Sequence, residues 1–238
     1  MIMSLPEIKI SEAEHVLIKN LVDHYLKNRN FIEVMLKQLS YAILGSPKLM
    51  AYVHSTKSRL KDPDHLEDKL LRKLVEAKRK KKPFTISQKN LLYKINDLAG
   101  FRILHLHTEQ IVSINRELLA LFKEYRFRLL EKPNARTWDD ENRDFFRHCG
   151  IVPIKSPTMY TSVHYVVESN SSTRATCELQ VRTLAEELWG EVDHTMNYPK
   201  ESAILSCREQ IKVLARVTSS CSRLVDSIFR SAKLEKNS

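Results

Sequence analysis

Residues 159–168 (MYTSVHYVVE) and 175–182 (ATCELQVR) predict two β-strands, because each alternates apolar and polar side chains with the two-residue period of a strand. The polar link 169–174 makes a hairpin the simplest connection between them. Upstream, the apolar run 101–106 (FRILHL) predicts a buried strand, and residues 126–131 predict another. The chain is therefore expected to contain a sheet that includes this hairpin.

Apolar residues at helical spacing predict the remaining elements. A helix over 11–29 opens with a capping box formed by Ser11 and Glu14. Further helices are expected over 31–44, 64–79, 87–96, 109–124, 183–196 and 203–235, with an extended segment over 48–59 and a long polar loop over 132–158. These elements predict an α+β fold in which a mixed sheet of roughly five strands is flanked by helices, with further helices at the N- and C-termini.

The composition favours a globular chain that binds anions. Hydrophobic residues make up 42% of the 238 residues, and 39 Lys and Arg against 29 Asp and Glu give a net charge of +10. A basic surface of this kind attracts nucleotides, RNA or acidic proteins, although it can equally be a solvated face. No run of about 20 apolar residues and no secretory signal pattern is present, so we expect no membrane span and a cytoplasmic location. The four cysteines form no CxxC pair, which favours free thiols over disulfides or a zinc site.

Basic side chains gather just before the first predicted strand of the apolar core. Arg59 and Lys61 point the same way if their segment is extended, and Lys69 follows Asp62 by about two helical turns. Three converging cations can hold a polyphosphate. An ordinary solvated surface is the alternative interpretation of this segment.

Two carboxylates stand at places where a sheet can bring them together. Asp97 precedes the apolar strand that contains Arg102, and Glu178 shares one strand face with Gln180 and Arg182. A pair of carboxylates on adjacent strands is suited to Mg²⁺, which leaves positions for phosphate oxygens and water. No Walker loop and no glycine-rich kinase loop is present, so side chains would hold the phosphates. A helix-to-strand cap at Asp97 and a solvated charged face around Glu178 are the alternatives.

Polar side chains also share one face of the strand predicted from residue 159. Tyr160, Ser162 and His164 lie on this face, and Lys155 precedes them. A tyrosine at the mouth of a strand can stack on a nucleobase. A strand with one solvated face would show the same pattern.

Taken together and in this order, the four segments resemble the RelA/SpoT alarmone synthetase family over roughly residues 52–198. Ser58–Lys61 is similar to the family motif G-R-x-K, and Asp97–Arg102 is similar to D-x-A-G-x-R. Lys155–His164 is similar to K-x-x-G-Y-x-S-x-H, and Glu178–Thr183 is similar to E-I-Q-I-R-T. The last motif is followed, as in the family, by Trp189 and by Glu191–Tyr198. The resemblance implies a synthetase domain over 51–200, with N-terminal helices (1–50) packed on it and a C-terminal helical tail (201–238).

The resemblance also implies the reaction and the role of each residue. In the family, the 3′-hydroxyl of GDP or GTP attacks the β-phosphorus of ATP, which yields (p)ppGpp and AMP. The resemblance implies that Asp97 and Glu178 are catalytic residues that bind Mg²⁺. On the ATP side, it implies that Arg59 and Arg102 surround the adenine and that Lys61 and Lys69 bind the phosphates. On the acceptor side, it implies that Tyr160 stacks on the guanine, that Lys155 and His164 contact an acceptor phosphate, and that Gln180 and Arg182 support the site.

The departures from the family pattern lie on the acceptor side. Met159 replaces the glycine before the family's tyrosine, and Thr161 stands where many relatives carry arginine. Three hypotheses therefore stay open: an enzyme that makes (p)ppGpp, a toxic synthetase that pyrophosphorylates the 3′ end of tRNA, and an inactive nucleotide-binding module. The basic run Lys78–Lys82 favours the tRNA hypothesis, whereas retention of the carboxylates opposes the inactive one. No His-Asp dipeptide of the family's hydrolase domain is present, so we expect a small stand-alone synthetase, with a homo-oligomer and an antitoxin as open partners.

Overall fold

The computed structural model describes residues 8–197 and 201–236, and a mixed seven-stranded sheet lies at the centre of this part of the chain. The strands are β1 (Ser55–Leu60), β2 (Ala99–His105), β3 (Arg128–Leu129), β4 (Asn134–Thr137), β5 (Val152–Lys155), β6 (Ser162–Glu168) and β7 (Thr176–Thr183). They are ordered β1-β2-β7-β6-β4-β5, and β3 pairs with β6 outside this path. The neighbours β2 and β7 are parallel, as are β4 and β5, and the other pairs are antiparallel.

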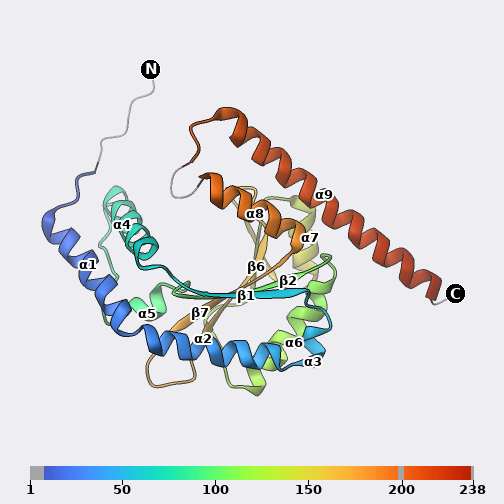
Figure 1. Ribbon diagram of the computed structural model, residues 1–238, viewed down its shortest axis with the longest axis horizontal. Helices are drawn as coiled ribbons and strands as arrows, with labels where there is room; N and C mark the ends of the chain where they lie inside the picture. The colour runs from blue at the N-terminus through green and yellow to red at the C-terminus, as the bar shows by residue number, and fades with distance from the viewer. Residues whose placement is uncertain (1–7, 198–200, 237–238) are drawn as a thin grey trace.

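Helices cover both faces of this sheet (Figure 1). They are α1 (Glu12–Lys27), α2 (Arg29–Leu44), α3 (Pro47–Met50), α4 (Pro63–Arg79), α5 (Leu91–Lys94), α6 (Gln110–Glu124), α7 (Asp140–His148), α8 (Leu184–Asn197) and α9 (Leu205–Lys236). α2, α3, α5 and α6 lie on one side of the sheet, and α8 and α9 lie on the other (Figure 1). The main core includes fully buried Leu39 of α2, Ile103 of β2 and Leu179 of β7. Within the described residues, no helix combines the length and the apolar character needed to cross a membrane.

The predicted hairpin and the N-terminal capping box are both present. β6 and β7 pair antiparallel, with His164 opposite Gln180. The backbone N–H of Glu14 donates to the hydroxyl of Ser11, and the carboxylate of Glu14 accepts from the backbone N–H of Ser11. The α+β class, the mixed sheet and the helices at both ends are confirmed.

The segment 132–158, which we predicted to be a long loop, is instead a compact unit of β4, α7 and β5. Asp139 caps α7 by accepting hydrogen bonds from the backbone N–H groups of Glu141 and Asn142. Phe146 is the buried residue of this helix, so its charged sequence lacks the apolar stripe by which a helix is predicted. The two additional strands raise the sheet from the expected five strands to seven.

Two further expectations were wrong in extent. The helix predicted over 87–96 is the single turn α5, because the side chain of Asn90 accepts from the backbone N–H of Ser87 and donates to the carbonyl of Thr85. The segment 48–59 begins in the one-turn helix α3 and becomes a strand only at Ser55.

The two C-terminal helices pack against each other beside the sheet. Trp189 of α8 belongs to a second, smaller core with Ile211 of α9, and its indole N–H donates to the carbonyl of Ile211 at 3.0 Å. Farther along α9, the buried carboxylate of Asp226 accepts from the backbone N–H of Glu109 and lies 3.0 Å from Nδ1 of His107. Contacts at Ile211 and at Asp226 therefore hold α9 against α8 and against the segment that precedes α6.

Candidate active site

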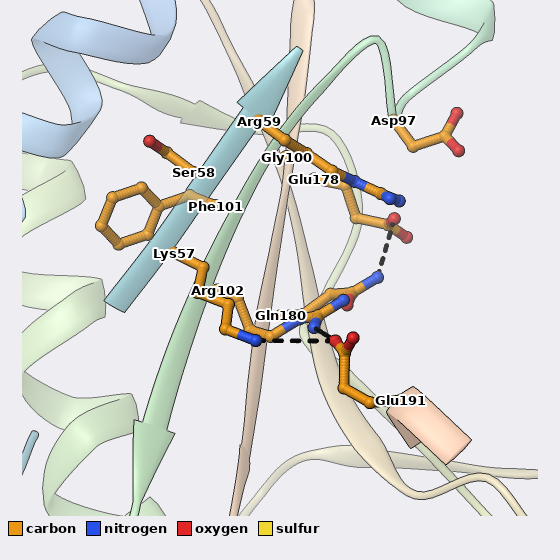
Figure 2. A pocket seen from close by; sticks show the side chains of 10 residues that line it. All are labelled: Lys57, Ser58, Arg59, Asp97, Gly100, Phe101, Arg102, Glu178, Gln180 and Glu191. Atoms are coloured by element: carbon orange, nitrogen blue, oxygen red, sulfur yellow. Dashed lines mark hydrogen bonds and ion pairs between the residues drawn. The ribbon is translucent and has the colours of Figure 1, made fainter. Parts of the chain in front are cut away.

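Alternation along three neighbouring strands directs one set of side chains into a pocket on the α8 side of the sheet. Its volume is about 260 Å³, and its lining includes Lys57, Arg59, Asp97, Arg102, Glu178, Gln180 and Glu191. Figure 2 shows Lys57, Arg59 and Arg102 on this side of β1 and β2, whereas the side chains of Ser58 and Phe101 point the other way. The register places Arg59 opposite Gly100 on β2, and Gly100 opposite Glu178 on β7. Basic and acidic residues from separate parts of the sequence thus meet across adjacent strands.

Asp97 lies just before β2 and is held by two lysines. Lys69 Nζ lies 2.6 Å from its Oδ1 and Lys61 Nζ lies 2.9 Å from its Oδ2, so each carboxylate oxygen accepts a charged donor. Burial acts to raise the pKa of Asp97, but Lys69 and Lys61 outweigh it and bring the pKa to about 2. Asp97 is therefore ionised at neutral pH, and its charge is balanced by the two lysines that were predicted to bind phosphate.

Helix α1 contacts the backbone of Lys61, one of the two lysines that bind Asp97. Tyr25 of α1 is fully buried and donates its hydroxyl to the backbone carbonyl of Lys61 at 2.5 Å. The backbone N–H of Lys61 in turn donates to the carbonyl of Leu98, which continues the pairing of β1 with β2 by one residue. Helix α1 therefore helps to position Lys61 next to Asp97.

Glu178 is held by a histidine and a glutamine rather than by lysines. Its Oε1 lies 2.9 Å from Nδ1 of His164 on β6, and its Oε2 accepts from the amide of Gln180 at 3.2 Å. Burial acts to raise the pKa of Glu178, and the contact with His164 more than offsets this effect, so the pKa is lowered. Glu178 is thus a second ionised carboxylate in the pocket.

A second pocket of about 350 Å³ adjoins the first and shares four of its residues. Both pockets are lined by Arg59, Arg102, Gln180 and Glu191. The second pocket also includes Tyr160, Arg182 and Trp189. A molecule in one pocket would therefore lie next to a molecule in the other.

Tyr160 lies between the strand and helix α8. Its hydroxyl is 3.2 Å from Nε2 of His164, its ring centroid is 6.5 Å from that of Trp189, and the guanidinium carbon of Arg182 lies 5.7 Å from the ring centroid. The strand β6 begins only at Ser162, so Tyr160 precedes the strand instead of belonging to its face as expected. It remains in one pocket with Arg182 and Gln180.

Seven of the eleven predicted site residues line the two pockets, and four line neither: Lys61 and Lys69, which bind Asp97, and Lys155 and His164. Lys155 is exposed on β5, which forms the edge of the sheet opposite β1, and it lines neither pocket. His164 is buried behind Tyr160 and Glu178 and contacts both. Tyr198, the end of the last family motif, lies outside the described residues.

Sequence reasoning missed two residues of the site. Lys57 lines the first pocket, and Glu187 of α8 binds Lys57 and Arg102 with its Oε1 at 2.8 and 2.7 Å. Lys57 could have been found, because Lys57, Arg59 and Lys61 alternate at the two-residue period of a strand. Glu187 carried no comparable signal, since it is one of several acidic residues on its helix.

Comparison with known proteins identifies the family. The pattern described as "Region found in RelA / SpoT proteins" matches residues 58–203, which is more than half of the chain and includes both pockets' motifs. The chain belongs to the RelA/SpoT family. No curated protein is significantly similar to it in sequence.

Solved structures show the same fold. The small alarmone synthetase 1 of Bacillus subtilis bound to its product pppGpp is 21% identical, with a TM-score of 0.57 over 90% of this chain and 97% of that chain. A structure of the same synthetase bound to AMPCPP is 17% identical over 90% and 98%, with a TM-score of 0.52. A GTP pyrophosphokinase family protein of Streptococcus pneumoniae is 16% identical over 95% and 97%, with a TM-score of 0.53. The resemblance to the RelA/SpoT family and the predicted fold class are thereby confirmed.

Proposed function

We propose that this protein transfers pyrophosphate from ATP to the 3′-hydroxyl of GDP or GTP and so makes (p)ppGpp. The observation that carries the proposal is the pair of adjoining pockets that share Arg59, Arg102, Gln180 and Glu191. In this reaction the acceptor oxygen bonds to the β-phosphorus of ATP, and the bond from that phosphorus to the oxygen of the α-phosphate breaks to release AMP. Two substrates that react with each other need two such neighbouring sites.

The first pocket is suited to ATP and its metal. Asp97 and Glu178 are ionised carboxylates, and oxygen ligands of this kind hold Mg²⁺ together with phosphate oxygens. In the described part of the chain, no group of three or more His, Cys, Asp or Glu side chains could hold a metal ion. Asp97 and Glu178 would hold a Mg²⁺ ion only together with other ligands, which phosphate oxygens and water would supply. The metal would supply charge stabilisation for the transferred phosphates.

Lys61 and Lys69 are placed to exchange partners when ATP binds. Each lysine contacts one oxygen of Asp97, and the phosphates of ATP offer more negative charge than this single carboxylate. If the lysines moved to phosphate, the Asp97 oxygens would become available to hold the metal. Arg59 and Arg102 line both pockets, where a flat guanidinium can stack on the adenine.

The second pocket is suited to the acceptor nucleotide. Tyr160 and Trp189 provide aromatic surface, and Arg182 and Gln180 provide donors beside it. His164, with one ring nitrogen near Tyr160 and the other near Glu178, links the acceptor tyrosine to the metal-side carboxylate. We infer that it positions both groups.

Transfer of label from ATP tests the function directly. The purified protein with β-³²P-labelled ATP and Mg²⁺ is offered GDP, GTP or bulk tRNA, and the products are separated. We expect label on GDP or GTP with release of AMP. Label on tRNA alone would replace the acceptor, and no transfer to any of the three would leave the inactive nucleotide-binding hypothesis.

A tRNA end is the second candidate acceptor, and the end of α4 favours it. Arg79, Lys81 and Lys82 are exposed side by side there. The same helix carries Lys69 into the site, about 15 Å from Arg79 at 1.5 Å per residue. A long polyanion that extends from the first pocket along α4 could therefore reach these charges, whereas a single nucleotide could not.

A further inference from the structure

The carboxylate of Glu187 contacts the arginines of both proposed substrate sites. Its Oε1 accepts from Arg102 at 2.7 Å and from Lys57 at 2.8 Å, on the ATP side. Its Oε2 accepts from Nε of Arg182 at 2.6 Å, on the acceptor side, and also contacts the NH2 group of the same guanidinium. One buried side chain is thus shared by two guanidinium groups that line different parts of the paired pockets.

The surroundings fix the position of this carboxylate. The side chain of Glu187 is 8% exposed and that of Arg182 is 3% exposed, so neither can exchange its partner for water. At the start of α8, the backbone N–H of Thr183 donates to Glu186 and the backbone N–H of Glu186 donates to the hydroxyl of Thr183, which fixes the first turn. Burial acts to raise the pKa of Glu187, but Lys57, Arg182 and Arg102 bring it to about 2, so the group stays charged.

Gly190, one turn after Glu187, confines Arg182 from the other side. A Cβ atom at this position would lie 2.5 Å from NH1 of Arg182, which is too close for a real contact, and 3.1 Å from its Cζ, which is tight. The guanidinium therefore lies in a slot between Glu187 and the glycine, with the ring of Tyr160 nearby. Its direction toward the second pocket depends on both residues.

We propose that Glu187 is a positioning residue that couples the two substrate sites by orienting Arg102 toward ATP and Arg182 toward the acceptor nucleotide. The inference rests on the proposed function, because it assigns Arg102 and Arg182 to the two substrates. A purely structural ion pair would stabilise the fold without changing how one substrate affects the binding of the other. Coupling of two ligands is a free energy that binding measurements detect directly.

Three variants separate these roles. Glu187→Gln removes the charge shared by both arginines. Glu191→Gln is the matched control, because Glu191 also binds NH1 of Arg102, at 2.9 Å, but is 55% exposed and forms no ion pair with Arg182 in the described part of the chain. Gly190→Ala displaces Arg182 and leaves the charge of Glu187 unchanged.

Calorimetry with AMPCPP and with GDP, each alone and in the presence of the other, measures the effect. We expect Glu187→Gln to weaken both ligands by about tenfold or more and to abolish their coupling, because a buried charge loses its partner. Glu191→Gln should weaken AMPCPP by only about threefold, as is typical of an exposed pair, and Gly190→Ala should weaken GDP alone. In ¹⁵N spectra, the Nε–H signal of Arg182 should lose its downfield position in Glu187→Gln.

The outcomes distinguish this inference from the proposed function. If the wild type transfers label but Glu187→Gln behaves like Glu191→Gln, the inference is overturned and the function stands. If both ligands bind with coupling that depends on Glu187 but no label moves, the function fails and the positioning role stands. If Glu187→Gln unfolds, Glu187→Asp takes its place, because it keeps the charge on a side chain that is one methylene shorter. If the Nε–H signal of Arg182 shows that its contact with residue 187 is lost in this folded variant and the coupling between the ligands is unchanged, the inference is overturned.

Discussion

At the residue scale, the carboxylate of Asp97 contributes charge to the site and stability to the fold. Its pKa falls from 3.8 to about 2, so its stabilising contribution is fully present above pH 3.8 and is lost as the pH falls through about 2. Asp97→Asn should therefore be less stable than the wild type at pH 7, with a gap that closes between pH 4 and 2. Urea unfolding of both proteins over this range measures the gap. A gap that stays constant with pH would show that the two lysines do not hold the carboxylate.

The same substitution should abolish the reaction and the metal site together. We expect Asp97→Asn to lose at least about a hundredfold in label transfer, because a charged group that acts on the transferred phosphates is gone. Mn²⁺ should bind the wild type tightly only with AMPCPP present, since Lys61 and Lys69 contact both Asp97 oxygens without it. Electron paramagnetic resonance of Mn²⁺ with and without AMPCPP measures this. Equally tight binding without the nucleotide would refute the exchange of partners.

Tyr160 should act through its ring more than through its hydroxyl. Stacking on a base is worth about 1–3 kcal/mol, so Tyr160→Ala should lower kcat/KM for the acceptor by roughly ten- to a hundredfold. Tyr160→Phe keeps the ring and loses the contacts of the hydroxyl with His164 and Ser162, so its effect should be mild. Kinetics with the acceptor varied at saturating ATP separate the two. If the Phe variant is as impaired as the Ala variant, the hydroxyl and not the ring is the functional group.

At the element scale, the start of α8 contains a carboxyl group with an unusual titration. Burial raises the pKa of Glu186 from 4.5 to about 7, despite its bonds to Thr183 and the charge of Arg182. Between pH 4.5 and about 7, Glu186 is therefore protonated in the folded state and ionised in the unfolded state. The resulting stabilisation is present below pH 4.5 and is lost as the pH rises through about 7.

Glu186→Gln should remove this dependence while keeping an acceptor for the backbone of Thr183. Denaturant unfolding at pH 5, 6, 7 and 8 should show the wild type losing stability, relative to the variant, across this range. Glu12→Gln on α1 changes an exposed acidic residue of another helix start and serves as the control. Parallel curves for wild type and Glu186→Gln would mean that the carboxyl titrates normally.

At the scale of the whole molecule, the net charge of +10 offers a way to distinguish the two candidate acceptors, GDP or GTP and a tRNA end. The triple variant of Arg79, Lys81 and Lys82 to Gln removes three exposed charges at the end of α4. Lys78 is left unchanged, because it binds Glu14 at 2.6 Å and ties α4 to α1. If tRNA is the acceptor, activity should fall and its dependence on salt should flatten by about one unit of slope per lost phosphate contact.

A matched variant controls for the change in net charge. Lys19, Lys48 and Lys123 are exposed on α1, α3 and α6, and their replacement by Gln removes the same charge from other surfaces. Equal losses in both triple variants would indicate general electrostatic attraction. Transfer to GDP or GTP that neither variant changes would favour the nucleotide acceptor.

The local patterns of the sequence determined the class of the fold and most of the site. Alternation along β7 predicted that Glu178, Gln180 and Arg182 share a face, and the capping box predicted where α1 begins, because both depend on neighbouring residues alone. Hydrophobic periodicity failed at α7, where Phe146 is the one buried residue and charged side chains dominate. There the pairing of β4 with β5 stabilises the unit, and such pairing joins residues that are far apart in the chain.

Only the tertiary structure decided which charges meet. Glu187 became a shared partner of Arg102 and Arg182 because β2 and β7 are adjacent and α8 crosses above them, and Tyr25 reached Lys61 because α1 packs beside α4. Lys155 belonged to a family motif, yet β5 carries it to the far edge of the sheet. The sequence by itself thus determined the residue types and their local direction. The contacts between distant segments, which set burial and therefore charge and affinity, arose only from the packing of the whole chain.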